Sequence, residues 1–184
     1  MQRIIKKGDT LIEVLFAMAV FSFLSITTIS LMNQTTASAQ GNLESTQARN
    51  LINQQAEIIR FAHEAYINDN GNTDYAGLWN NISGRTVSSG EVVNLSDVTS
   101  CDIDLPDNAF AINASSFDII SASPIADAAP SADNGFWIYA VEGGDSNNGY
   151  YDFYFQTCWY APGRNNPTTI DTVIRLYDTR SSSS

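Results

Sequence analysis

Cysteine and histidine are scarce in this chain of 184 residues. It has two cysteines and one histidine, His63, so cysteine-rich zinc sites are excluded and a histidine-based triad has one candidate. Basic residues are also few: nine Lys and Arg stand against twenty Asp and Glu, and the formal net charge is -11. Because nucleic-acid binding depends on neutralising phosphates, we expect no direct nucleic-acid partner. Without a nucleophile–base pair or phosphate-binding loop, we expect no enzyme and no firm cofactor.

Charge is absent from one long stretch near the N-terminus. The 19 residues from Val14 to Met32 carry no charge, and 14 of them are apolar while five are Ser or Thr. As a helix this run would cover about 29 Å, close to the thickness of a bilayer's hydrocarbon core. A surface helix of a soluble protein would show regularly spaced polar residues, and this run does not. Arg3, Lys6 and Lys7 precede the run and predict that the N-terminal tip stays in the cytoplasm.

The apolar run has three possible fates. A secretory signal peptide would be removed after the run, and Ala37-Ser38-Ala39 fits the small-residue pattern of such a cleavage site. An uncleaved single-span anchor would keep the whole N-terminus. A cut before the run would leave the hydrophobic helix on the mature protein, and the residues at that boundary favour this third interpretation.

The boundary sequence at residues 6–14, KKGDTLIEV, closely resembles the leader of type IV pilins and pseudopilins. In that family a basic leader ends in Gly, a membrane-embedded prepilin peptidase cuts after the Gly, and a Glu stands fifth after the cut. The resemblance implies cleavage between Gly8 and Asp9 and makes Glu13 the assembly residue. It also implies N-methylation of the first mature residue, here Asp9, where the family usually has Phe. The motif covers only the first tenth of the chain.

The resemblance implies a structural subunit, major or minor, of a type IV pilus or pseudopilus. Its partners would be the prepilin peptidase, other pilin subunits in a helical filament, and the pilus assembly platform. The chain would cross the inner (cytoplasmic) membrane once with its head outside, before entering an extracellular pilus or a periplasmic pseudopilus. The alternative is a monomeric, membrane-tethered binding module that recognises a glycan or a protein through aromatic strands.

Glu13 also has a physical role that does not depend on the family. A carboxylate costs about 2.5–3.5 kcal/mol at the centre of a bilayer, so it needs a partner. Cleavage after Gly8 would supply one, because the new α-amine is largely cationic at neutral pH and can meet Glu13 of a neighbouring copy. That pairing would set the axial register between copies. The local alternative is a capping box, for which Thr10 and Glu13 have the required spacing.

Helical periodicity continues beyond the apolar run until a turn cluster at residues 68–72. We therefore expect one helix from about Thr10 to about Ile67, with Gly41 as its weak point and His63 partly exposed at the edge of its packed face. The predicted segments are a leader peptide at 1–8, a membrane or filament-core helix at 9–35, its amphipathic continuation at 36–68, a globular head at 69–180 and a disordered tail at 181–184.

The head is rich in Asn, Ser, Asp and Gly, with aromatic clusters that predict strands. An antiparallel sheet packed on the second half of the helix would give an α+β fold. The strongest predicted strands are 136–142, 150–159 and 168–177, of which the first two are joined by a loop at 143–149, and weaker strands are predicted at 91–95 and 117–120.

The two cysteines, Cys101 and Cys158, lie on the part of the chain that would be exported to an oxidising compartment. We therefore expect a disulfide between them, as many pilins carry one in the head. Closing this loop would stabilise the head by about 4 kcal/mol in the chain-entropy model. Two unpaired buried thiols are the alternative.

Two further patterns leave alternatives open. Asp145, Asn147 and Asp152 place oxygen ligands near a turn, which calcium prefers, although a plain polar hairpin explains them as well. A set of aromatic residues could form a sugar-stacking surface or the core of the strands, and we expect the core. This set is Trp137, Tyr139, Tyr150, Tyr151, Trp159 and Tyr160.

Overall fold

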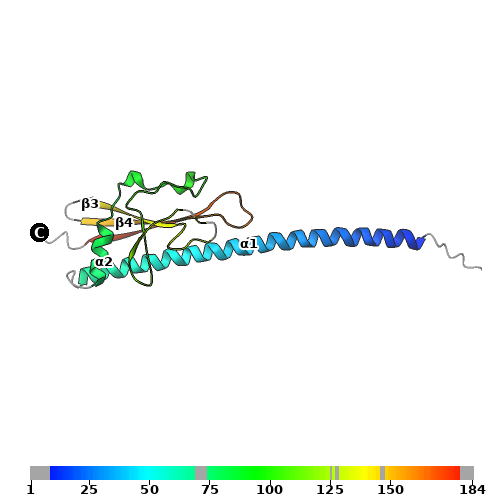
Figure 1. Cartoon of the computed structure of the whole chain (residues 1–184), viewed down its shortest axis with the longest axis horizontal. Helices are drawn as coiled ribbons and strands as arrows, with labels where there is room; N and C mark the ends of the chain where they lie inside the picture. Colours follow the sequence, from blue (N-terminus) through cyan, green and yellow to red (C-terminus); the bar gives the residue numbers. More distant parts are fainter. Residues whose placement is uncertain (1–8, 69–73, 125, 127–128, 146–147, 179–184) are drawn as a thin grey trace, which may run out of the picture. The chain divides into compact units, whose positions relative to one another are not determined.

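The computed structural model describes residues 9–68, 74–124, 126, 129–145 and 148–178. The chain divides into two compact units, Met1–Gln40 and Gly41–Ser184, and each is considered by itself. Helix α1, Asp9–Asn68, runs through both units (Figure 1). Its bounds agree with the helix predicted from about Thr10 to about Ile67, and Gly41 is accommodated within it.

The second unit is built on a five-stranded antiparallel sheet with the strand order β2-β1-β3-β4-β5. The last three strands confirm the three strongest predictions, and β2 overlaps the weaker strand predicted at 117–120. Strand β1 was not predicted, because three residues are too few to show an alternating pattern. The strands are β1 Phe110–Ile112, β2 Ile119–Ser121, β3 Phe136–Asp145, β4 Asn148–Trp159 and β5 Thr168–Asp178.

One face of the sheet packs against the part of α1 that belongs to the second unit, and against helix α2, Asp74–Ser83. Alternation along β4 sends Phe153 and Phe155 to this face, where they share one core cluster with Ile59 of α1 and Trp79 of α2. A helix and an antiparallel sheet sharing one core confirm the α+β fold.

Helix α2 was not predicted, because the head was expected to lose helical order after residue 68. Its sequence DYAGLWNNIS has weak local helix propensity, since Gly and Asn are poor helix formers. The helix is instead stabilised by tertiary packing: Leu78, Trp79 and Ile82 lie on one side and are buried against the sheet.

The other face of the sheet is covered by residues 85–105, which lie on the side away from α1 (Figure 1). The strand predicted at 91–95 is wrong, because this segment contains two short 3₁₀ helices, η1 Ser89–Glu91 and η2 Leu95–Asp97. Glu91 accepts the backbone amide of Ser88 at 2.7 Å, and Asn94 accepts that of Ser96 at 3.1 Å. These local side-chain bonds favour turns over a strand ladder.

The hairpin between β3 and β4 is tighter than predicted. The expected loop at 143–149 is mostly strand, since the pairing continues through Gly143 with Tyr150 to Asp145 with Asn148. The ring of Tyr150 lies over Gly143: a Cβ there would lie 2.6 Å from Cζ of Tyr150, so a larger residue would displace that ring.

Candidate membrane and assembly site

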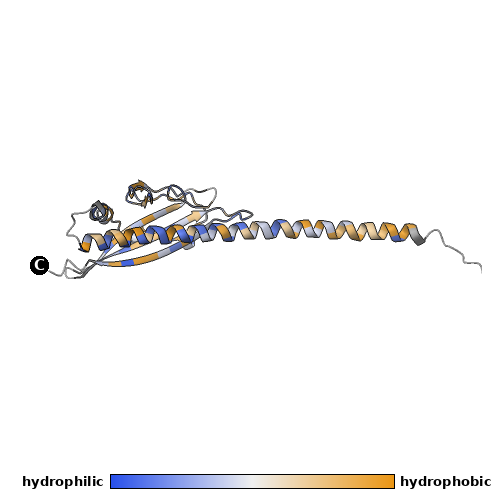
Figure 2. Ribbon diagram, turned by 90° about the horizontal axis from the view of Figure 1, so that it is seen from below, coloured by the Kyte–Doolittle hydropathy of each residue, from blue (hydrophilic) through white to orange (hydrophobic). Residues whose placement is uncertain are grey.

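In the first unit, helix α1 presents apolar side chains in every direction. None of the side chains at residues 11–40 is buried within the chain, and Phe16 and Phe21 are 72% and 73% exposed. Figure 2 shows hydrophobic residues around this part of the helix. The helix is long and apolar enough to cross a membrane. Among the described residues no side chain buries this apolar surface, and an exposed apolar surface of this extent is typical of a membrane-spanning or protein-binding segment.

Several hydroxyl groups inside the apolar run find their hydrogen bonds within the helix. Ser22, Ser25, Thr27 and Thr28 each donate to a backbone carbonyl three or four residues earlier, at 2.8–2.9 Å. An unpaired hydroxyl in hydrocarbon would cost several kcal/mol, on the order of 2–7. These four residues are therefore compatible with lipid or with the interior of a helix bundle.

Glu13 is the one charged residue from Leu11 to Leu43 in the sequence, and its side chain is exposed in the second turn of α1. Its carboxylate is thus open to a partner outside the helix. Gly8 lies outside the described residues, and the side chains of Asp9 and Thr10 are not described. Cleavage after Gly8, N-methylation of Asp9 and the capping box therefore stay predictions.

The second half of α1 differs, because one stripe of it is buried against the head. The members of the stripe recur at helical spacing and are mostly small, which lets the helix lie close to the sheet. They are Ala48, Ile52, Ala56, Ile59 and Ala62, each at most 5% exposed.

Two polar side chains of α1 join the helix to the strands. The carboxamide of Gln55 is fully buried, and its Nε2 donates to the carbonyl of Ile112 at 2.6 Å while its Oε1 accepts the amide of the same residue at 3.0 Å. Trp159 Nε1 donates to the carboxylate of Glu44 at 3.1 Å. Gln55 was not singled out from the sequence, where its place within the buried stripe was the available signal.

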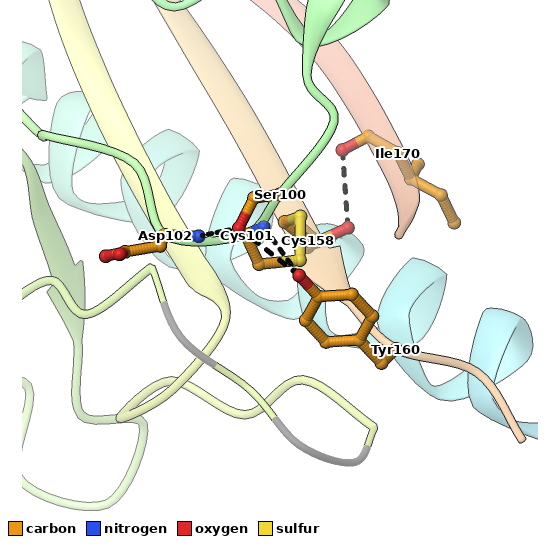
Figure 3. The surroundings of a disulfide bond; sticks show 7 residues. Ser100, Cys101, Asp102, Cys158, Tyr160 and Ile170 are labelled. Atoms are coloured by element: carbon orange, nitrogen blue, oxygen red, sulfur yellow. Dashed lines mark hydrogen bonds between the residues drawn. A yellow bond between two sulfur atoms is a disulfide. The ribbon is translucent and has the colours of Figure 1, made fainter. Parts of the chain in front are cut away.

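The predicted disulfide is present. The Sγ atoms of Cys101 and Cys158 are 2.08 Å apart, and both residues are fully buried (Figure 3). The bond ties the segment that covers the second face of the sheet to strand β4. Next to it, the hydroxyl of Tyr160 accepts the backbone amide of Cys101 at 3.3 Å.

The aromatic set divides between core and surface. Trp137, Tyr139 and Trp159 are fully buried, so they belong to the core, as expected. Burial raises the pKa of the Tyr139 hydroxyl. Tyr150, Tyr151 and Tyr160 are only partly exposed, so the six residues do not form one open sugar-stacking surface.

Asp152 is the one calcium candidate whose side chain is described. Its two carboxylate oxygens accept Nε and Nη2 of Arg175, each at 2.7 Å, and this bonding raises the pKa of Arg175. Asn147 lies outside the described residues, and the side chain of Asp145 is not described. Within the described part of the chain, no group of three or more His, Cys, Asp or Glu is placed to hold a metal ion.

His63 is more buried than predicted. It is 9% exposed, and its ring centroid lies 4.4 Å from that of Trp79 on α2. The prediction treated it as an edge residue because α2, which covers it, was not expected.

Comparisons with known proteins give no family. No protein-family model, curated protein or solved structure matches the chain.

Proposed function

We propose that the chain is a structural subunit of a filament of the type IV pilus or pseudopilus kind. The leader at 1–8 is removed by a prepilin peptidase between Gly8 and Asp9. The apolar helix at 9–35 first holds the chain in the inner membrane and later packs against the same helix of other copies at the assembly platform.

The observation that carries this proposal is the contrast along α1. One stripe of the second half of the helix is buried on the head, whereas the apolar side chains of the first half are left exposed by the residues that the structure describes. A helix that leaves a membrane needs another apolar environment, and a bundle of identical helices supplies it. Glu13 fits the same scheme, because a carboxylate among apolar helices needs a cation from a neighbouring copy.

The first test removes the carboxylate. We expect Glu13→Gln and Glu13→Ala to abolish filaments seen by electron microscopy of sheared surface material, while the amount of chain in the membrane fraction stays unchanged. The matched control is Glu57→Gln, which changes an exposed carboxylate on the second half of the same helix. A monomeric tethered module would tolerate all three changes, and normal filaments from Glu13→Ala would contradict the proposal.

The second test uses the distribution of lysine, which occurs only at positions 6 and 7. A chain that begins at Asp9 carries one amine, its α-amine. Zero-length carbodiimide coupling of filaments should join this amine to Glu13 of another copy, as identified by peptide mass spectrometry. The product should disappear in Glu13→Gln, and coupling to a different carboxylate would contradict the proposed pairing.

A further inference from the structure

Strand β5 forms the longer of the two sheet edges. The strand order leaves β5 and β2 at the edges, with 11 residues in β5 and three in β2. Among the described residues, no backbone–backbone hydrogen bond joins β5 to any residue outside β4. Helix η2 lies near β5, yet Asp171, Thr172 and Val173 are exposed. The hydroxyl of Thr172 donates to the carbonyl of Asp171 at 2.8 Å, a bond that strand pairing would have to displace. A sheet edge whose backbone groups lack a neighbouring strand can pair with another strand.

The side chains on one face of β5 alternate between opposite charges and exposed apolar groups. Asp171, Val173, Arg175 and Tyr177 share the face that points away from α1. Val173 is 48% exposed and Tyr177 is 58% exposed, which is high for large apolar side chains in a sheet. Asp171 and Arg175 lie two residues before and two residues after Val173. When two copies of this strand pair antiparallel, each of these charges can therefore face the opposite charge of the other copy.

We infer that β5 is a docking edge for the β5 strand of a second copy of this chain, paired antiparallel about a two-fold axis at Val173. In this register Val173 faces Val173 of the other copy, and Asp171 faces Arg175 twice. On the opposite face, Ile170 faces Leu176. Two strands of this length form about ten backbone hydrogen bonds, and each opposite-charge pair adds to them.

The charges select this register over its neighbours. Because side chains alternate between the two faces of a strand, the nearest alternative registers place Val173 of one copy opposite Asp171 or Arg175 of the other. The first register places Asp171 opposite Val173 and the second places it opposite Tyr177, so both lose the charge pairs. Arg175 already donates Nε and Nη2 to Asp152, and its Nη1 is the group that would take the carboxylate of Asp171 from the other copy.

The symmetry limits where this contact forms. Antiparallel pairing about the two-fold axis reverses the second copy's sheet, and with it the part of α1 that packs on that sheet. The contact therefore joins two heads that face each other rather than neighbours that point the same way in one filament. It does not depend on cleavage after Gly8 or on Glu13, so either proposal can fail alone.

Cysteine cross-linking of the full chain tests the pairing. Chains are placed one per nanodisc, so that only heads on separate discs can meet, and are oxidised in solution. Val173→Cys lies on the two-fold axis and should give a covalent dimer, while the native disulfide is buried and protected. The control is Tyr177→Cys, which replaces a more exposed residue but lies about 27 Å from its own copy in this register. It should give no dimer above background.

A charge reversal supplies the second measurement. In the Val173→Cys chain, Asp171→Arg turns both charge pairs repulsive without touching Asp152, and we expect the dimer yield to fall about tenfold. Asp118→Arg makes the same change in charge on an exposed residue away from β5 and should leave the yield unchanged. Equal cross-linking of Val173→Cys and Tyr177→Cys, no dimer from Val173→Cys, or equal yields from the two Arg variants would each overturn the inference.

Discussion

The two halves of helix α1 share one backbone geometry and differ in what covers them. The first half has no charge from Val14 to Leu43, and none of its described side chains is buried, whereas the second half carries a stripe of Ala and Ile buried on the sheet. Because helical backbone hydrogen bonds are internal, the same element is stable in lipid, in a bundle or on a head. The side-chain pattern alone therefore decides the partner of each half.

Trp79→Ala should have the largest effect on the stability of the head. Trp79 is 2% exposed, and its ring packs against rings of both α1 and the sheet. Its ring centroid lies 5.8 Å from that of Phe153. We expect its removal to lower the free energy of unfolding of the head by about 3–5 kcal/mol, measured by chemical denaturation of the full chain in detergent. Phe21→Ala in the first half should leave that free energy unchanged. Equal losses of unfolding free energy in Trp79→Ala and Phe21→Ala would mean that the first half of α1 also stabilises the head.

Loss of the disulfide should have the next largest effect on the stability of the head. Replacing both Cys101 and Cys158 by Ser opens a link across 57 residues, and we expect the head to lose about 2–5 kcal/mol of unfolding free energy. The same denaturation assay checks this, and Ser100→Ala beside the bond is the control. Membrane association should not change, because we propose that it depends on the first half of α1. Release of the double variant from membranes would contradict this separation.

A charge in the first half of α1 should weaken membrane insertion and leave the stability of the head unchanged. Leu24→Arg places a cation in the middle of the apolar run, where it costs about 2.5–3.5 kcal/mol of membrane insertion. We expect less chain in carbonate-washed membranes and unchanged unfolding of the head. Asn50→Arg, on an exposed position of the second half, is the matched control and should remain in the membrane. Equal retention of both variants would show that lipid does not cover the first half.

Gln55→Leu should have the smallest of these effects. The change leaves the amide and carbonyl of Ile112 without their Gln55 partners in a buried place, at a cost of about 1–3 kcal/mol. The loss should appear as a lower denaturation midpoint. Gln54→Leu, an exposed neighbour on the same helix, should cost little. Equal stability of the two variants would show that the Gln55 bonds do not hold β1.

Long periodic elements could be predicted from the sequence and short ones could not. The 60-residue helix and the strands β3, β4 and β5 carry their own hydrophobic patterns, and the two cysteines allowed one pairing. Helix α2 and strand β1 depend on burial against distant residues, as does the position of His63. Residues 91–95 contain the β-branched Val92 and Val93, which favour a strand, but the side chains of Glu91 and Asn94 bond to nearby amides and favour turns.

For the site, the sequence predicted the apolar helix and the disulfide because both depend on residue type and chain order. It did not predict Gln55 or the Asp152–Arg175 pair, since these rest on the registers that bring residues far apart in sequence together. Strand pairing fixes which side chains face each other, and local composition does not encode it.

The intact mass of the chain extracted from membranes or sheared filaments tests the proposed processing most directly. We predict a mature chain that begins at Asp9 and keeps the apolar helix, with one amine available to an acylating reagent. A mature chain that begins near Gln40, without residues 11–32, would contradict it.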